Sequence, residues 1–521
     1  MKNRKTLYIA LLIYTATGAA LLPAFQYLIN PDGISYLNIA GQYLKGNFGN
    51  AVNACCSPMY SWLIVPFLAA GAPPLLSARL ASLVIGFVSV IGVALLAGRL
   101  ELPKKIETFI VTASAPLALI FVNECSTPDH LVVCAVVFYL YLITDRGYAE
   151  RYSNGVLCGV AGAAGYLCKS YLMPFFLVHF ILANAYFYFR MPSRKRVLAN
   201  AFAGLAVFVI ISGSWVAVLS YKYGGFTVGT AGGAVHALVG PGPDFDRQPT
   251  ETLGLLRLPY DGATSAWDDP SYINARDWSP FSSAENLRHQ LFLVGRNLKA
   301  EAEHLLGFTW FFPIFIIAGL FYTIMELRVP GTHQEAFLIF TAAAVYCSGF
   351  LLLLVTRRYL WVMGVLLLLL CGYMLKHLFR SCPPVYRTAV AVLMLGSFLM
   401  PLRPFVTPPY KGYRRAAGGR EVYESSMALR ERLGGPGFRM ASDDRWGMSL
   451  YHAYHLGAAY LGQVRESDPD PAILKSLAEN RVEYFMVWDG GREYGFLAGM
   501  QVAARGSLQG HAFRIYRMDA G

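Results

Sequence analysis

The sequence predicts an α-helical polytopic membrane protein that ends in a small α/β domain. Of the 521 residues, 55% are hydrophobic and only 15% are charged, a balance typical of membrane proteins. The hydrophobic residues also gather into runs close to the ~20 residues that a membrane-spanning helix needs. After residue 403 this pattern stops, and short segments of mixed polarity take its place.

About eleven apolar runs are expected to span the membrane. They are residues 6–28, 76–98, 106–122, 129–144, 153–168, 172–189, 198–220, 307–326, 335–355, 359–376 and 386–402. A further segment, 59–71, is short and contains a proline, so we expect a re-entrant or interfacial helix there. The first run follows three basic residues and no small-residue cleavage site comes after it, which predicts a retained anchor.

The basic residues between these runs predict the orientation of the chain. With a cytoplasmic N-terminus, the cytoplasmic loops contain most of the lysine and arginine, and the opposite loops contain few. This distribution accounts for most of the net charge of +12, so no nucleic-acid partner is expected. The long or acidic connections then lie on the external face; they are 29–58, 123–129, 221–306 and the tail after 403.

The first external connection begins with Asp32, directly behind an apolar run. The residues that follow it, in "PDGISYLNIAGQYLKG", have the spacing of an amphipathic helix that ends at Gly46. An aspartate at this position often caps such a helix. A catalytic carboxylate at the membrane boundary is the alternative.

Three further external turns contain ionisable residues. Glu124 and Asp129 flank a proline in "NECSTPDHLVV", and Lys169 lies in "GYLCKSYLMP". The last turn, "TRRYLWV", contains Arg357 and Arg358. Caps, snorkelling side chains and interfacial anchors would explain each residue alone, but ionisable groups at a membrane boundary are also functional candidates. Together they predict a site that activates a hydroxyl and holds a phosphate.

In order, "PDGISYLNIAGQYLKG", "SPMYSWLIVPFLAAG", "NECSTPDHLVV", "AAGYLCKSYLMPFFL" and "RRYLWVMGVLLLL" resemble the GT-C superfamily of polytopic glycosyltransferases. The most similar branch contains the protein O-mannosyltransferases and the lipid A aminoarabinose transferases. The resemblance covers roughly residues 5–376. Two departures are visible: Gly33 stands where relatives often have a second acid, and "CCSPMY" replaces a lysine-proline-proline segment.

The resemblance implies a role for each matching residue. Asp32 becomes the candidate base and Asp129 the second acidic position, while Tyr36 is the aromatic residue at helical spacing from Asp32. Lys169 and either Arg357 or Arg358 become candidates for binding the donor phosphate. Glu124 and Tyr359, in the same turns, are expected to contact substrate.

The resemblance also implies the reaction. A sugar on a polyprenyl-phosphate donor would move to a hydroxyl acceptor, usually with inversion, on the external face of a bacterial inner membrane. No cofactor is implied with certainty, and a divalent metal is compatible with the chemistry. In this interpretation residues 1–403 form the GT-C-like catalytic domain, including the external loops 29–58 and 221–306, and residues 404–521 form the extracytoplasmic domain.

Several features keep other interpretations open. The loop 221–306 is long enough to fold as a lid or as a structural cap, with an amphipathic helix expected at 284–305. A metal site is conceivable at Asp443, Asp444, His452 and His455. The cysteines are expected to be mostly buried thiols, and only Cys55 and Cys56 look placed for a disulfide or a metal.

A lipid or solute transporter is the main alternative function, because about eleven spans suit it too. Transporters place ionisable groups near mid-depth. Here the interiors of the runs are nearly free of charge. Within one run, the small residues Gly155, Gly159, Gly162 and Ala163 are expected to let helices pack closely.

Overall fold

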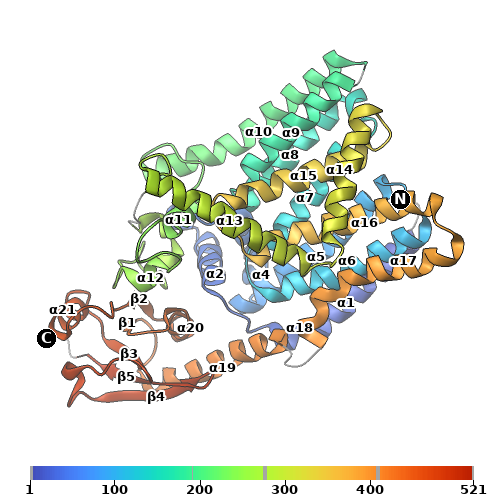
Figure 1. Cartoon of the computed structure of the whole chain (residues 1–521). Coiled ribbons are helices and arrows are strands. Elements are labelled where there is room, and N and C mark those ends of the chain that lie inside the picture. Colours follow the sequence, from blue (N-terminus) through green and yellow to red (C-terminus); the bar gives the residue numbers. More distant parts are fainter. Residues whose placement is uncertain (1–3, 191, 274–277, 407–410, 519–521) are drawn as a thin grey trace.

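The computed structural model describes residues 4–190, 192–273, 278–406 and 411–518. Figure 1 shows a bundle of helices with a small sheet at one side of it. The bundle helices are α1 (Arg4–Phe25), α4 (Pro58–Ala69), α5 (Pro74–Arg99), α6 (Lys104–Glu124), α7 (Asp129–Ile143), α8 (Tyr152–Cys168), α9 (Leu172–Arg190), α10 (Arg194–Tyr223), α14 (Phe312–Arg328), α15 (Gln334–Leu351), α16 (Trp361–Ser381) and α17 (Pro384–Gly396).

Each of the eleven predicted spans falls on one of these helices. Within the described residues, eight helical segments are long and apolar enough to cross a membrane. The other three predicted spans are shorter helices: α7 has 15 residues, and α8 and α14 have 17 each. The multi-pass helical fold is therefore confirmed, whereas the count of eleven spans stays a prediction.

A second group of elements gathers near the sheet, and we call this end of the bundle the domain side. It contains α2 (Pro31–Leu44), α3 (Phe48–Ala51), α11 (Ala231–Leu238), α12 (Pro249–Thr252), η2 (Ala266–Asp268), η3 (Pro270–Tyr272) and α13 (Ala284–Leu306). The two predicted amphipathic helices correspond to α2 and α13. Ser283 caps α13 by accepting a hydrogen bond from the Asn286 N–H at 3.1 Å.

The C-terminal domain is a five-stranded sheet with helices. Its elements are α18 (Arg403–Val406), α19 (Lys411–Arg432), β1 (Arg439–Ser442), α20 (Trp446–Leu456), β2 (Ala459–Gln463), α21 (Asp470–Glu479), β3 (Tyr484–Trp488), η6 (Gly495–Leu497), β4 (Val502–Leu508) and β5 (His511–Arg517). The strand order is β2-β1-β3-β5-β4, with β1 parallel to β2 and β3, and β5 antiparallel to β3 and β4. This confirms the predicted α/β domain.

The C-terminal domain is fixed to the bundle and to the loop that follows α10. One buried apolar cluster contains Ile34 and Leu37 of α2 together with Met440 and Leu450 of the domain. The Tyr460 N–H donates to the Thr264 carbonyl at 2.7 Å, so the loop extends the β2 edge of the sheet. Burial of apolar surface and backbone pairing thus hold the loop between the domain and α2.

Close helix packing occurs where the small-residue segment predicts it. A Cβ on Gly155 would lie 2.1 Å from the Asn200 carbonyl oxygen, and one on Gly159 would lie 2.2 Å from the Gly204 carbonyl oxygen. Both distances are far below van der Waals contact. Glycine at these two positions lets α8 and α10 approach backbone to backbone.

Candidate active site

Six of the eight predicted site residues line one cavity of about 680 Å³, four of them charged. Asp32 comes from the first turn of α2, Asp129 begins α7, Lys169 follows the end of α8, and Arg358 lies in η4 (Arg357–Leu360). We call this space the carboxylate cavity. Its walls come from α2, α7, α11, η3 and η4, so it lies on the domain side rather than within the bundle.

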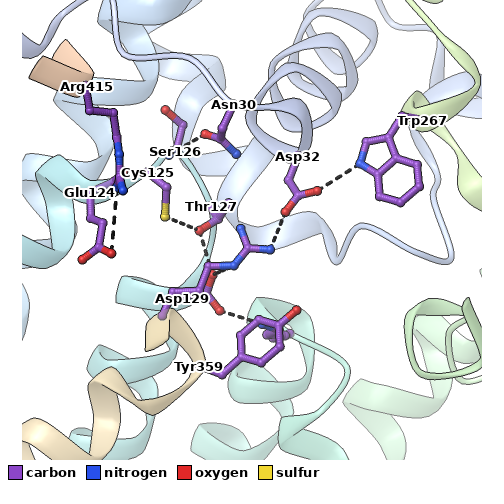
Figure 2. A network of polar contacts seen from close by, with 12 residues as sticks. Asn30, Asp32, Glu124, Cys125, Ser126, Thr127, Asp129, Trp267, Tyr359 and Arg415 are labelled. Carbon is purple, nitrogen blue, oxygen red and sulfur yellow. Dashed lines mark hydrogen bonds and ion pairs between the residues drawn. The ribbon is translucent and has the colours of Figure 1, made fainter. Parts of the chain in front are cut away.

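The Asp32 carboxylate accepts hydrogen bonds from side chains of two other elements. Its Oδ2 accepts a hydrogen bond from Arg358 Nη2 at 2.7 Å, and its Oδ1 accepts one from Trp267 Nε1 at 3.0 Å. Figure 2 shows the indole of Trp267 directed at the Asp32 carboxylate. The N-cap of α2 is Asn30. The capping alternative for Asp32 is therefore wrong.

Opposing effects act on the Asp32 pKa. Burial raises the pKa, because a buried carboxylate loses solvation by water. The positive charge of Arg358 and the hydrogen bonds from Trp267 and Arg358 lower it, and they outweigh burial, so the pKa lies below its ordinary value. Asp32 is consequently ionised at neutral pH.

Asp129 holds the two cations of the cavity. Its Oδ1 accepts a hydrogen bond from Lys169 Nζ at 2.6 Å, and its Oδ2 accepts one from Thr127 Oγ1 at 2.7 Å. Arg358 Nε lies 3.7 Å from the same Oδ2. The Asp129 side chain is only 3% exposed, so these contacts replace water around it (Figure 2).

Two of the predicted tyrosines also line the carboxylate cavity. Lys169 Nζ lies 3.9 Å from the centroid of the Tyr359 ring, a cation–π contact that fixes the ammonium group beside Asp129. Tyr36 lines the cavity from α2, and its ring packs edge-on against Tyr60 with 5.4 Å between centroids.

The structure separates Glu124 and Arg357 from this group. Glu124 lines a second cavity, where its carboxylate lies 3.9 Å from Arg415 of α19. Arg357 is absent from the lining of the carboxylate cavity, although it immediately precedes Arg358. Residues predicted on the same side of the membrane therefore do not all line the same cavity.

Sequence reasoning missed Trp267 and Asp268. Both lie in η2, in a loop segment that reads only as acidic. Burial raises the pKa of Asp268 to about 6, and its Oδ2 accepts hydrogen bonds from Asn38 Nδ2 and the Thr264 N–H, each at 2.8 Å. These bonds tie the loop to α2 and so position Trp267 over Asp32. The tryptophan in a polar loop was the available signal.

Two of the four conceivable metal ligands in the C-terminal domain have structural partners. His452 Nδ1 is hydrogen-bonded to Ser426 Oγ at 2.8 Å, and Asp443 Oδ1 accepts from the Trp488 N–H at 2.9 Å. Within the described part of the chain, no three His, Cys, Asp or Glu side chains are grouped to hold a metal ion. All nine cysteines are free, Cys55 and Cys56 included.

Comparisons with known proteins find one matching family model. Residues 56–217 match the model of the dolichyl-phosphate-mannose-protein mannosyltransferase family. No curated protein sequence matches the chain, so the remaining similarity lies in the fold.

Solved structures extend the similarity to almost the whole chain. ArnT from Cupriavidus metallidurans in the apo state is 15% identical, with 97% of each chain covered and a TM-score of 0.55. The same protein bound to undecaprenyl phosphate gives 14% identity, 97% coverage of each chain and a TM-score of 0.52. The oligosaccharyltransferase of Archaeoglobus fulgidus is 13% identical and gives a TM-score of 0.51, with 92% of this chain and 69% of that chain covered. The chain is therefore similar in fold to ArnT and to the archaeal oligosaccharyltransferase, and residues 56–217 match the mannosyltransferase family model.

Proposed function

We propose that this protein moves a sugar from a polyprenyl-phosphate donor to a hydroxyl acceptor in the carboxylate cavity. The observation that carries the proposal is the convergence of Asp32, Asp129, Lys169 and Arg358 on one cavity, from segments more than 300 residues apart. Carboxylates and fixed cations are the groups that hydroxyl activation and a phosphate leaving group require.

The walls of the cavity support a lipid-borne donor. Ala231, Ala234, Val235 and Leu238 of α11 line one part of it, whereas Lys169 and Arg358 line another. An isoprenoid chain favours the apolar wall and its phosphate favours the cations. The binding of undecaprenyl phosphate by ArnT, a protein of similar fold, agrees with this assignment.

The reaction we propose is a single displacement. The Asp32 carboxylate takes the proton of the acceptor hydroxyl, and the hydroxyl oxygen bonds to the anomeric carbon. The bond from that carbon to the phosphate oxygen breaks, and its electron pair stays on the phosphate. Lys169 and Arg358 stabilise this charge as it develops, and the configuration at the anomeric carbon inverts.

Donor binding would also tune the base. Arg358 donates to Asp32, and a donor phosphate competes for the same guanidinium. When Arg358 turns to the phosphate, Asp32 loses the main charge that lowers its pKa, while burial continues to raise the pKa. Asp32 then becomes a stronger base only when the donor is present. In this proposal Asp129 takes no part in the proton transfer. It positions Lys169 and Arg358, with which it forms ion pairs.

The test uses purified full-length protein in detergent and a panel of polyprenyl-phosphate sugars. We expect release or transfer of one sugar, with loss of lipid-linked sugar matched by the appearance of polyprenyl phosphate. With an acceptor present, the product should have the inverted configuration. A protein that leaves every donor intact, yet moves one across liposome membranes, would be a transporter, and the proposal would be wrong.

A further inference from the structure

A second cavity, of about 700 Å³, lies between the end of α6 and the C-terminal domain. We call it the arginine cavity, because Arg414 and Arg415 of α19 and Arg445 before α20 line it. Glu124 and Glu251 are the acidic residues of its lining. The proposed displacement does not use any of these five residues.

The positive charge of the arginine cavity is only partly neutralised. Arg415 pairs with Glu124, donating to its carbonyl at 3.1 Å with the carboxylate 3.9 Å away. Arg414 is exposed and has no ion pair or hydrogen bond with any residue that the structure describes. Arg445 is also incompletely hydrogen-bonded. Arg414 and Arg445 therefore have donors available for an anion.

Arg445 is held in an unusual backbone conformation. Its φ is +51°, in the left-handed region that residues other than glycine rarely adopt. Its Nε is buried without a hydrogen-bond partner among the described residues, and the nearest carboxylate oxygen, from Asp444, is 4.0 Å away. A strained residue with an unpaired buried donor indicates a ligand site.

The lining of the arginine cavity also suits a sugar. Trp446 and Tyr451 of α20 lie beside the arginines. Aromatic rings provide flat apolar surface for the C–H face of a sugar ring, and arginine forks pair with planar oxyanions. This combination indicates a sugar with an acidic substituent.

The arginine cavity adjoins the carboxylate cavity. Asn30 lines the former and Asp32, two residues later, lines the latter. The Trp446 ring centroid lies 6.1 Å from that of Trp267, whose indole donates to Asp32. Burial raises the pKa of Tyr451, and the negative charge of Asp32 raises it further. The Tyr451 phenol of the arginine cavity therefore interacts electrostatically with the proposed base. A ligand in the arginine cavity therefore lies next to Asp32.

We propose that the arginine cavity binds the acceptor as an anionic sugar, through a phosphate or carboxylate substituent, and presents its hydroxyl to Asp32. The inference rests on the glycosyl transfer proposed above and adds the chemical class of the acceptor. Arg414 and Arg445 hold the oxyanion, and Trp446 and Tyr451 contact the sugar ring.

The experiment compares three probes that differ in one substituent: methyl glucoside, its 6-phosphate and methyl glucuronoside. Binding of each to the full chain is measured at equilibrium, and each is then tested as acceptor with the active polyprenyl-phosphate sugar. We expect one anionic probe to bind at least about tenfold more tightly than methyl glucoside, because charge-assisted hydrogen bonds are worth that much. The better of the two identifies phosphate or carboxylate as the recognised group.

Variants assign the effect to the cavity. Arg414→Gln combined with Arg445→Gln should remove the preference for the anionic probe, while hydrolysis of the donor by water continues. Arg430→Gln combined with Arg432→Gln, an equal change of charge at exposed positions farther along α19, should keep the preference. A transfer rate that depends neither on the charge of the acceptor nor on the two arginines would overturn the inference. The proposal of glycosyl transfer would then still hold. Arginine-dependent binding of the anionic probe, without turnover of any donor, would support the site and contradict the transferase.

Discussion

Arg358 contacts both carboxylates of the proposed active site. It donates to Asp32 at 2.7 Å and lies 3.7 Å from Asp129. Any change at this position alters the charge balance at the proposed base and removes a donor for the leaving phosphate. Its effect on rate and its effect on pH dependence can be measured separately.

Replacing Arg358 with glutamine should shift the acid limb of the pH–rate profile to higher pH. Asp32 acts as a base only when ionised, so the rate falls as the pH drops through its pKa. Without the arginine charge, burial dominates and that pKa rises. The rate itself should fall about 10²- to 10³-fold, as for the loss of one stabilising donor. The measurement is kcat/KM for the donor between pH 4 and pH 9, because kcat/KM reports the pKa of the free enzyme, in which Arg358 contacts Asp32.

Arg357→Gln is the matched control, since Arg357 does not line the carboxylate cavity. Its profile should keep the wild-type acid limb. If Arg358→Gln slows turnover but leaves the limb in place, Asp32 is not the titrating base.

At this scale the sequence allowed part of the site to be predicted. Asp32, Asp129, Lys169 and Arg358 each lie at the end of an apolar run on one predicted side of the membrane, which is enough to suggest that they meet. The sequence could not show which cavity Glu124 faces, because successive side chains of a helix point in directions about 100° apart. Trp267 depends on contacts between segments more than 200 residues apart.

Among the contacts between elements, the contact between α8 and α10 has no room for a side chain at its glycines. Gly159→Val should prevent this approach, because even a Cβ would lie 2.2 Å from the Gly204 carbonyl oxygen. We expect a destabilisation of several kcal/mol, as for overpacked cores, and a lower yield of monodisperse protein. Gly213→Val on α10 has open space around it and should retain the wild-type yield and melting temperature. Equal behaviour of the two variants would contradict the close packing.

Within the C-terminal domain, Asp443 should make stability depend on pH. Burial raises its pKa from 3.8 to about 7, so the folded state binds a proton that the unfolded state releases between these values. The free energy of unfolding should therefore fall as pH rises from about 4 to 7, by at most about 1.4 kcal/mol per pH unit. Thermal unfolding of Asp443→Asn should lose this dependence.

Glu493→Gln provides the comparison for that measurement, because Glu493 is an exposed acid of the same domain and is not among the charges that raise the pKa of Asp443. It should unfold with the wild-type pH dependence. A wild-type stability that rises between pH 4 and 7, with the slope unchanged in Asp443→Asn, would rule out the buried acid as its source.

Elements were predictable where one local pattern dominates. Long apolar runs and the amphipathic spacings of α2 and α13 are such patterns. Helix α19 was not predicted, because its sequence is charged and rich in small residues, and its position depends on distant contacts. A Cβ on Gly419 would lie 2.4 Å from the Tyr27 carbonyl oxygen, so this helix packs directly on the chain after α1.

Over the whole molecule, the proposed chemistry lies where three parts meet. The bundle contributes Asp129, Lys169 and Arg358, the loop after α10 contributes Trp267, and the C-terminal domain covers the neighbouring arginine cavity. Residues of α2 and η3, on the domain side, line the carboxylate cavity. A transporter would instead need its polar cavity at mid-depth in the membrane.

The most direct measurement of the central claim is donor turnover by Asp32→Asn, with donor binding measured on the same preparation. We predict that turnover falls about 10²- to 10⁴-fold, the usual contribution of a general base, while the donor still binds. Asp261→Asn removes the same charge from an exposed position of the loop and should keep wild-type turnover. Wild-type turnover by Asp32→Asn would contradict the assignment of Asp32 as the base.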